Sequence, residues 1–553
     1  MRTARFVCFF SIFVFATALL VLLAAQSNPA VHAHQPAALS AATAQPETGK
    51  PKVLANAVVY ETEANSATSV ALADLNGDGY PDIVVAAVYS GISVLMGNGD
   101  GTFQAPVLYP TSLNASAAVS LAIGDVNGDG RLDLVVVSGY ISSPDSGASV
   151  NVILGNGDGT FQAPNEFFSS AGNGANSVLI KDVNGDGHPD LILADGCQSP
   201  NCSLGSNGGV SVLLGNGDGT FQAEVIYDSG GVQAQSIALV DMNGDGYPDL
   251  IVANLCENGR NCDLNGLTGT GGPGGVSVLQ GNGDGTFQSA VSYYSGGYDA
   301  NPIAIGDVNG DGLPDVIVAN NCESGSDCAH KVGPGGVSVL FGNGDGTLQA
   351  AVSYSSGGYG TSSLAIADLN GDGYPDVVVA GNKSAGNYPH GQLGLLLGVG
   401  DGSFQEPASF QSRGYSAEGL AALDVNGDGR PDVVVVNNYA RLFRSGSGKV
   451  GVLLNISTSK PSVALTSSPN PSHVNQSVTF KATVTSNPSI PNGEVVTFYD
   501  GNINLGTGTT TNGVATLITS FSQAKTHPIK ASYPGDAFHK AKTSGTLKQV
   551  VNP

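Results

Sequence analysis

The nine residues Asp74-Leu-Asn-Gly-Asp-Gly-Tyr-Pro-Asp82 decide the architecture, because the same pattern, Asp-x-Asn-Gly-Asp-Gly-x-x-Asp, occurs seven times in the 553-residue chain. Successive copies begin 51 to 66 residues apart. Their first residues are Asp74, Asp125, Asp182, Asp241, Asp307, Asp368 and Asp424. A repeat with a nearly constant period is typical of an array in which each copy forms one supersecondary unit.

A second pattern, Gly-Asn-Gly-Asp-Gly-Thr-Phe-Gln, follows the acidic pattern in the first six repeats and drifts only in the later ones. It begins at Gly97, Gly155, Gly215, Gly281, Gly342 and Gly398. Between the patterns lie short β-branched runs, which indicate four strands in each repeat. In the second repeat we expect these strands at Val119–Gly124, Leu134–Ser138, Ser149–Leu154 and from Phe161 onward. Four strands repeated seven times predict an all-β, seven-bladed β-propeller.

The two ends of the repeat array indicate how the ring closes. The seventh repeat runs through Lys449–Asn455 and then stops, without the second pattern or a fourth strand. The segment Val53–Tyr60 precedes the first acidic pattern and is similar to the fourth strand expected at Phe103–Tyr109. We therefore expect this N-terminal segment to complete the last blade, which removes an open sheet edge.

The charge of the chain is concentrated in the acidic patterns. The formal net charge is −24, from 21 Lys and Arg against 45 Asp and Glu, and this balance argues against binding of nucleic acid. Three Asp in each of seven loops account for 21 of those 45 acidic residues. Clustered carboxylates repel one another unless a cation neutralises them, so the clusters favour cation binding.

Each acidic loop carries the ligand pattern of a calcium site. Positions 1, 3 and 5 supply carboxylate or amide oxygens, position 7 a backbone carbonyl and position 9 a further carboxylate, and such all-oxygen sets suit Ca²⁺. About seven structural calcium ions are expected. The predicted ligands are Asp74, Asn76, Asp78, Tyr80, Asp82, Asp125, Asn127, Asp129, Arg131, Asp133, Asp182, Asn184, Asp186, His188, Asp190, Asp241, Asn243, Asp245, Tyr247, Asp249, Asp307, Asn309, Asp311, Leu313, Asp315, Asp368, Asn370, Asp372, Tyr374, Asp376, Asp424, Asn426, Asp428, Arg430 and Asp432.

Two other interpretations of the acidic loops were considered. An EF-hand needs a bidentate Glu at position 12. That position holds Val or Leu in all seven copies, beginning with Val85, so an EF-hand is excluded. The remaining alternative is a hairpin turn rich in Asn and Asp that binds no metal, because Asn-Gly and Asp-Gly are strong turn formers.

The repeats resemble FG-GAP/VCBS repeats, the family of integrin-α-like propellers, through the acidic pattern described above. The resemblance covers residues 53–457. It implies a calcium ion in the hairpin between the first and second strands of each blade. Only some blades of integrin α chains carry such a loop, whereas all seven carry one here. We find nothing that suggests the integrin β-subunit as a partner.

The composition changes after the repeats. Residues 458–553 are rich in Ser and Thr, contain alternating strand patterns and lack acidic loops, which predicts a small Ig-like β-sandwich. The segments Gly493–Gly501 and Ala531–Asp536 resemble the bacterial Ig-like repeat domain. By analogy with that family, we expect this domain to act as a spacer or an adhesive stalk.

The N-terminus indicates export. Arg2 and Arg5 precede an apolar run over Phe6–Ala25, and Val31 and Ala33 provide small residues at a cleavage site. We interpret residues 1–33 as a signal peptide and residues 34–52 as a flexible linker. An uncleaved membrane anchor is the alternative, because the run is long for a signal peptide. The mature protein is expected to be secreted or held at the cell surface, with no membrane span after cleavage.

Six cysteines remain after the signal peptide, in three local pairs. In a secreted protein such an even set predicts disulfides. The predicted pairs are Cys197 with Cys202, Cys256 with Cys262, and Cys322 with Cys328, each after the second strand of a blade.

If the acidic loops lie on one face, the connections on the opposite face form a candidate binding rim. Three of these connections carry the pattern Ser-x-Gly-Tyr, with tyrosines at Tyr298, Tyr359 and Tyr415. Tyrosines beside glycines are typical of recognition surfaces. The alternative is that each tyrosine covers the hydrophobic end of a blade.

The sequence indicates a binding protein rather than an enzyme, because it contains no Ser-His-Asp spacing, nucleophile elbow or phosphate loop. We expect a monomeric protein that acts in adhesion or recognition and binds an extracellular protein or glycan. A lectin-like carbohydrate-binding module is the alternative. A polysaccharide lyase or hydrolase is a third hypothesis, which would need a pair of acids on the loop face.

Overall fold

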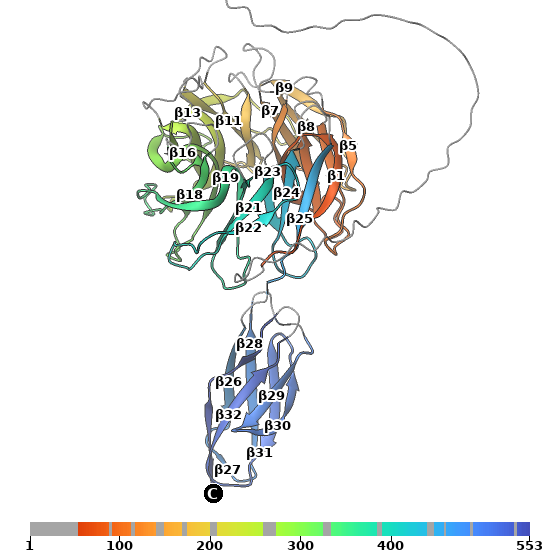
Figure 1. Ribbon diagram of the computed structural model, residues 1–553, viewed down its shortest axis with the longest axis vertical. Helices are drawn as coiled ribbons and strands as arrows, with labels where there is room; N and C mark the ends of the chain where they lie inside the picture. Colours follow the sequence, from red (N-terminus) through yellow and green to blue (C-terminus); the bar gives the residue numbers. More distant parts are fainter. Residues whose placement is uncertain are drawn as a thin grey trace, which may run out of the picture. The chain divides into compact units, whose positions relative to one another are not determined.

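The computed structural model describes residues 53–87, 91–111, 117–139, 149–168, 174–198, 207–257, 272–324, 333–383, 390–438, 447–457, 461–486, 490, 492–535 and 539–553. Within these ranges the regular elements are β-strands, with no helix (Figure 1). The predicted signal peptide and linker lie outside the described residues.

Residues 53–457 form seven four-stranded blades. The first strand of each blade ends at an acidic loop, and the second strand begins at the last Asp of that loop. The first strands are β2 (Ala67–Ala73), β6 (Ala117–Gly124), β10 (Ala175–Lys181), the second halves of β13 (Val225–Val240), β16 (Val291–Gly306) and β19 (Val352–Ala367), and β23 (Ser416–Leu423). The second strands are β3 (Asp82–Ala87), β7 (Asp133–Gly139), β11 (Asp190–Asp195), β14 (Asp249–Glu257), β17 (Asp315–Cys322), β20 (Asp376–Asn382) and β24 (Asp432–Asn438).

The outer half of each blade is made of its third and fourth strands. The third strands are β4 (Gly91–Leu95), β8 (Ser149–Ile153), β12 (Asn207–Leu213), β15 (Pro273–Leu279), β18 (Pro334–Leu340), β21 (Gly391–Leu396) and β25 (Ser447–Leu453). The fourth strands are β5 (Val107–Tyr109), β9 (Asn165–Phe168), the first halves of β13, β16 and β19, then β22 (Ala408–Gln411) and, in the last blade, β1 (Val58–Asn65).

The first strands form a closed ring. Each contacts the first strand of the next blade, and β23 of the last blade contacts β2 of the first. After its first aspartate, each second strand has an apolar run, such as Ile83-Val-Val-Ala-Ala87, and every residue of this run is buried. Such a strand is apolar on both faces because its blade packs between two neighbouring blades, which cover both faces of the strand.

The N-terminal segment pairs with the last blade. β1 is antiparallel to β25, with Val58 opposite Val452 and Tyr60 opposite Val450, and the two strands lie side by side in Figure 1. Before β1, the amide of Ala55 donates a 2.8 Å hydrogen bond to the carbonyl of Leu454. The segment expected to close the ring therefore forms the fourth strand of the seventh blade, and the strand itself begins at Val58 rather than Val53.

Two expectations about the strands are corrected. In the second blade the fourth strand begins at Asn165, because Phe161 forms an isolated bridge with Gly155 that closes the preceding turn. In the middle of the ring, the fourth strand of one blade and the first strand of the next are a single strand of 16 residues, in β13, β16 and β19. The connections between these blades are therefore strands rather than loops.

Residues from 461 onward form a β-sandwich. One sheet has the order β26 (Ser462–Ser468), β28 (Ser477–Thr485), β31 (Val514–Ser520). The other has the order β27 (Ser472–His473), β34 (Leu547–Asn552), β32 (Thr526–Tyr533), β29 (Val495–Asp500), β30 (Ile503–Thr509), with β33 (Lys542–Thr543) paired to β32. Fully buried Phe480, Phe498 and Tyr533 fill the core. The predicted fold class, an all-β propeller followed by an Ig-like sandwich, is confirmed.

Candidate metal loops

The first residue of each acidic loop holds the backbone of that loop. In the first loop, Oδ1 of Asp74 accepts a 2.8 Å hydrogen bond from the amide of Gly77, and Oδ2 accepts one of 2.8 Å from the amide of Gly79. Both glycines have positive φ, 74° and 87°, which L-residues rarely adopt. The equivalent two bonds recur in all seven loops, at 2.6–2.9 Å.

The ninth residue of each loop is buried and, in the first six blades, joins the loop to the second pattern of the same blade. Oδ2 of Asp82 accepts a hydrogen bond from the amide of Leu75 at 2.9 Å, and Oδ1 accepts one from the amide of Gly97 at 2.7 Å. These bonds also recur in every blade. The seven residues, each with 0% exposure, are Asp82, Asp133, Asp190, Asp249, Asp315, Asp376 and Asp432. The aspartate predicted as a ligand at position 9 thus has a structural role of its own.

The electrostatic environment of these buried carboxyl groups is unfavourable for their charge. Burial raises the pKa of all seven above the usual range, and the other two aspartates of each loop add to the rise, whereas the two backbone amides oppose it. The pKa reaches about 6 for Asp315 and about 7 for Asp376 and Asp432. A cation near these groups would favour their ionised form.

The donor set of the loops fits a hard cation. Asp74, Asn76 and Asp78 offer oxygen atoms, and a carboxylate oxygen that accepts one backbone bond keeps a further lone pair. Within the described ranges, however, no three Asp, Glu, His or Cys side chains are grouped so that they could hold a metal ion. Calcium remains a prediction at these sites.

The second pattern joins neighbouring blades, which the sequence analysis did not foresee. In the first blade, the amide of Gly101 donates a 3.2 Å hydrogen bond to the carbonyl of Val425, in the acidic loop of the seventh blade. Gly346 and Gly402 make the same bond to Met242 and Val308 of the preceding blades. A turn of one blade therefore forms a hydrogen bond with the acidic loop of the preceding blade.

Glycines of the second pattern are required where this contact is close. A Cβ added at Gly101 would lie 2.8 Å from the side chain of Leu454. A Cβ added at Gly99 would lie 2.4 Å from the ring of Tyr80, the seventh residue of the acidic loop. The occurrence of both patterns in the first six repeats was the sequence signal of this contact, but only the structure shows which residues pair.

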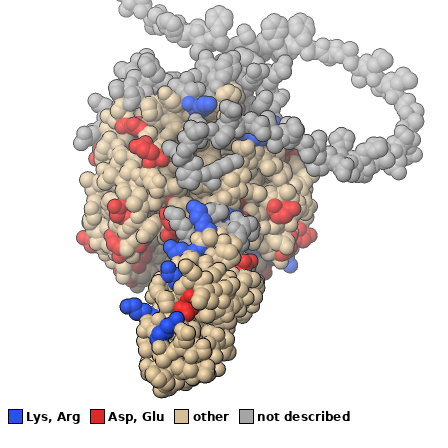
Figure 2. All heavy atoms as spheres, turned by 60° about the horizontal axis from the view of Figure 1, so that its bottom comes forward, with Lys and Arg blue, Asp and Glu red and all other residues tan. Residues whose placement is uncertain are grey.

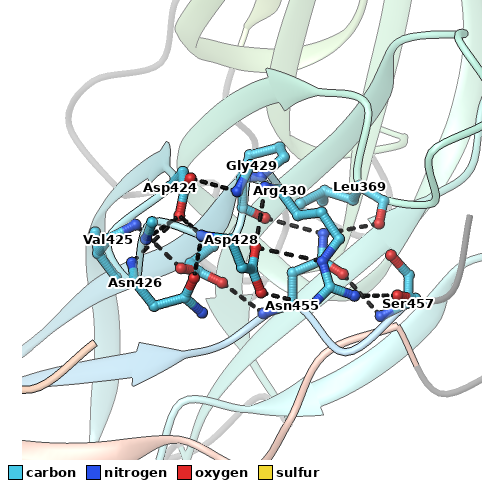
Figure 3. Close-up of polar contacts among 12 residues, drawn as sticks. Leu369, Asp424, Val425, Asn426, Asp428, Gly429, Arg430, Asn455 and Ser457 are labelled. Atoms are coloured by element: carbon cyan, nitrogen blue, oxygen red, sulfur yellow. Dashed lines mark hydrogen bonds and ion pairs between the residues drawn. The ribbon is translucent and has the colours of Figure 1, made fainter. Parts of the chain in front are cut away.

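The seventh blade lacks the second pattern, and Asn455 takes its place (Figure 3). The amide of Asn455 donates to Asp432, as Gly97 does to Asp82 in the first blade. Its side-chain Nδ2 donates to the carbonyl of Leu369 in the sixth blade at 2.9 Å and to that of Pro431 at 3.0 Å.

Arg430 completes this junction. Its guanidinium forms an ion pair with Asp428 at 2.5 Å and donates a hydrogen bond to the carbonyl of Ser457. Arg430 is only 5% exposed. The acidic loop of the seventh blade therefore has an internal cation as partner, in the blade that lacks a second-pattern turn of its own.

Acidic side chains on the propeller face of Figure 2 form separate patches with uncharged surface between them. This distribution matches the confinement of three aspartates to each loop.

Comparison with known families identifies the repeats. A model of the FG-GAP-like repeat matches residues 74–136, 137–193, 201–252, 263–318, 328–379 and 381–435, and one of the FG-GAP repeat matches residues 234–279. The chain belongs to the FG-GAP-like repeat family. A model of the bacterial Ig-like domain (group 3) matches residues 465–552 of this FG-GAP-like protein. Both family resemblances inferred from the sequence are confirmed.

Individual relatives are more distant. A segment of 153 residues is 29% identical to integrin alpha-IIb of Mus musculus and makes up 25% of this chain and 14% of the integrin, so the chain spans a small part of that relative. The BBS1N structure in complex with ARL6DN is similar with a TM-score of 0.42 at 11% identity, over 72% of this chain and 97% of that one. The NanB sialidase of Streptococcus pneumoniae gives 0.37 at 12% identity, over 71% and 70%. These structural likenesses are too weak to bear on function.

Two of the three predicted rim tyrosines of the FG-GAP-like propeller lie in strands, whereas Tyr415 lies in the connection between β22 and β23, as expected. Tyr298 lies in β16, opposite Pro273 on one side and Cys322 on the other, and Tyr359 lies at the equivalent place in β19. Tyr298 is half-buried and Tyr359 is 37% exposed. Tyr415 precedes β23 and is also half-buried. The structure thus places one tyrosine at each of three successive blade junctions.

The serine of the Ser-x-Gly-Tyr pattern has a structural role that the sequence analysis missed. Ser295 is buried and donates a 2.6 Å hydrogen bond to Oδ1 of Asn320, whose Nδ2 donates to Ser338 at 3.1 Å. Ser229 with Asn254 and Ser412 with Asn437 repeat this arrangement. Two of the three serines of the Ser-x-Gly-Tyr pattern, Ser295 and Ser412, therefore belong to buried networks between strands.

The cysteines are described only in part. Cys197, Cys256 and Cys322 are buried, with 0–2% exposure. Their predicted partners Cys202, Cys262 and Cys328 lie outside the described residues, so the pairing stays a prediction.

A cavity of about 830 Å³ lies beside two acidic loops. Its wall includes the apolar side chains of Leu179, Leu239 and Ile305, from three successive first strands, and the first aspartates of two loops, Asp182 and Asp241. The described part of the chain contains no helix long and apolar enough to cross a membrane.

Proposed function

We propose that this chain is an extracellular adhesion or recognition protein whose seven acidic loops bind calcium. The observation that carries the proposal is the geometry shared by the loops, since each of the seven folds around its first aspartate with the same two hydrogen bonds. Membership of the FG-GAP-like family and the similarity to an integrin α chain support a role in recognition.

Calcium would act on stability rather than on chemistry. Each loop connects the first two strands of a blade and contacts the next blade through the second pattern, as Val425 does with Gly101. An ion that neutralised the carboxylates of a loop would therefore strengthen both the hairpin and the junction.

Calcium binding is tested by isothermal titration and by thermal melting of the mature chain, with and without EGTA. We expect about seven bound ions and a clear fall in melting temperature on chelation, which Mg²⁺ does not reverse. The Asp78→Asn variant should lose one site. The matched control is Asp100→Asn, an exposed aspartate on a turn that bonds only Thr102 nearby. An unchanged melt with no titratable binding would instead support metal-free turns.

The ligand is proposed to be an extracellular protein or a glycan. Tyr359 is exposed at a blade junction, which gives a recognition surface that a glycan could stack on. Binding to a glycan array that is lost in the Tyr298→Ala/Tyr359→Ala double variant would support the lectin-like alternative. A folded protein without glycan binding would favour a protein ligand.

Secretion, the disulfides and the monomeric state belong to the same proposal. Sequencing the N-terminus of the exported protein tests cleavage after residue 33, and a retained N-terminus would support an anchor. Mass mapping under non-reducing conditions tests the predicted pairs, and light scattering tests the monomer. We propose no catalytic role, which turnover assays on polysaccharides would contradict if they showed bond cleavage.

A further inference from the structure

All seven first strands of the propeller contain a β-bulge at the same place. In β13, for example, Ala234 lies opposite Asn254 and Ser236 lies opposite Ala253, so Gln235 has no partner in β14. The register of the other six first strands shifts at the equivalent point. The bulged residues are Thr68, Val119, Asn176, Gln235, Asn301 with Pro302, Ser362 and Glu418. Bulges redirect side chains and are common beside functional sites.

The bulges surround one cavity of about 220 Å³. Residues from all seven first strands line it, and its wall is mainly polar. The bulged residues in the wall are Thr68, Asn176, Gln235, Asn301, Ser362 and Glu418. The cavity lies where the first strands begin, whereas the acidic loops follow their ends. It is therefore a different site from the candidate metal loops.

The wall of this cavity presents hydrogen-bond acceptors. Nδ2 of Asn176 donates to the carbonyl of Ala234 at 2.8 Å, and the hydroxyl of Ser362 donates to that of Ala417 at 2.5 Å. The hydroxyl of Thr68 likewise donates to a backbone carbonyl, that of Ala86, at 3.2 Å. Because these donors are used within the fold, the amide oxygen of Asn176 and the hydroxyl oxygen of Ser362 are placed to accept a hydrogen bond from a ligand.

Glu418 is the one ionisable side chain in the wall of the cavity, all of whose lining residues are described. Burial raises the pKa of Glu418, and a hydrogen bond with Ser416 opposes the rise. A carboxylate removed from water gains most from a cation that reaches it. The cavity thus combines acceptors with a single negative charge.

The backbone around the cavity is strained. Two residues before the bulged position, Ser66, Gln233 and Asp299 have φ of 51°, 54° and 54°, a region that non-glycine residues rarely adopt. Gly174 and Gly360 occupy the equivalent position in two other blades, with φ of 87° and 60°. Such strain persists where the surrounding structure requires a particular side-chain direction, and it concentrates at ligand sites.

We propose that this cavity binds a small molecule with one primary ammonium group and hydroxyl donors, an amino sugar by chemical class, with the ammonium at Glu418. Three N–H donors of an ammonium match a carboxylate and neighbouring amide oxygens, and hydroxyl groups match the remaining acceptors. The hydroxyl groups on the sugar ring, by bonding to these acceptors, then fix the orientation of the ligand. This inference does not rest on calcium binding, because the cavity and the acidic loops share no residue.

The test is isothermal titration of the full mature chain, in calcium, with glucosamine as the probe and glucose and N-acetylglucosamine as uncharged controls. We expect saturable binding of glucosamine alone. Glu418→Gln should weaken it about tenfold or more, since a charged hydrogen bond is lost. The exposed Glu406→Gln is the matched control and should bind as the unaltered chain does.

A second variant, Gln235→Leu, removes an acceptor without touching the carboxylate and should also weaken binding. The proposal is overturned if glucosamine shows no saturable binding to a protein whose melting curve is unchanged. It is also overturned if glucose binds equally well, or if Glu418→Gln binds like the unaltered chain. Loss of calcium binding with glucosamine binding retained would refute the proposed function of the loops and leave this inference standing.

Discussion

Nδ2 of Asn455 donates a 2.9 Å hydrogen bond to the backbone carbonyl of Leu369, across the junction between the sixth and seventh blades. The same nitrogen donates to the carbonyl of Pro431, and Asn455 is only 1% exposed. One side chain thus performs the joining role that a whole turn performs at other junctions.

We predict that Asn455→Ala lowers the free energy of unfolding by about 1–3 kcal/mol, because two buried carbonyls lose their donor. Chemical denaturation monitored by circular dichroism measures the change. The control is Asn98→Ala, which removes an exposed asparagine of the corresponding turn in the first blade and should cost little. Equal stability of the two variants would contradict a joining role for Asn455.

The buried carboxyl group of Asp195 gives a pH-dependent prediction. Burial raises its pKa well above the usual range, and Ser211 opposes the rise only in part. The folded state therefore binds the proton more tightly than the unfolded state, where the pKa is about 4. Stability contributed by the protonated form is present below about pH 4 and is lost as pH rises toward the folded pKa.

Asp195→Asn should thus be more stable than the unaltered chain at about pH 8, and the difference should shrink toward about pH 4. Asn254 and Asn320 occupy the same position in the next two blades, opposite Ala234 and Ala300. Denaturation across this pH range measures the effect. The reverse substitution, Asn320→Asp, should destabilise the protein most at high pH. A stability difference that does not vary with pH would argue against a raised pKa for the buried carboxyl group of Asp195.

The serine–asparagine network predicts a loss of stability without a change of fold. In Asn320→Ala the buried hydroxyl of Ser295 loses its acceptor and Ser338 loses a donor, so we expect a cost of about 1–3 kcal/mol. Tyr298→Ala, three residues beyond Ser295, should leave this network intact. If Tyr298→Ala lowers the free energy of unfolding more than Asn320→Ala does, the tyrosine rather than the serine is the residue of the pattern that stabilises the fold.

Closure by the N-terminal strand is tested by deletion. Removal of residues 53–62 takes away most of β1 and uncovers β25, including Val450 and Val452. We expect the free energy of unfolding to fall by several kcal/mol and the melting temperature to fall clearly, because a buried sheet edge is exposed. Deletion of residues 34–52 alone is the control and should change neither. A melt unaffected by the deletion of residues 53–62 would refute the closing role.

The number of blades and the position of each acidic loop could be predicted from the sequence, since both follow from a pattern whose local turn chemistry is strong. The fourth strand of the second blade was placed too early, because Phe161 is apolar but closes a turn with Gly155. The buried role of the serine in the Ser-x-Gly-Tyr pattern could not be predicted, because its partner Asn320 lies 25 residues from Ser295 and no local rule pairs them.

The β-bulges of the first strands could not be predicted from the sequence either. Thr68, Gln235 and Glu418 share no residue type, and their common place is set by the register of one strand against the next. Register is a property of pairs of strands, so a single strand does not reveal it.

The pairing of β1 with β25 also sets how the propeller responds to tension along the chain. The chain enters the ring at Val58 and leaves it near Val452, and these residues face each other in antiparallel strands. A pull on the two ends of the ring would load the hydrogen bonds of this seam one after another rather than together. The seam would open one residue pair at a time from Val58, so the seventh blade would lose its fourth strand first.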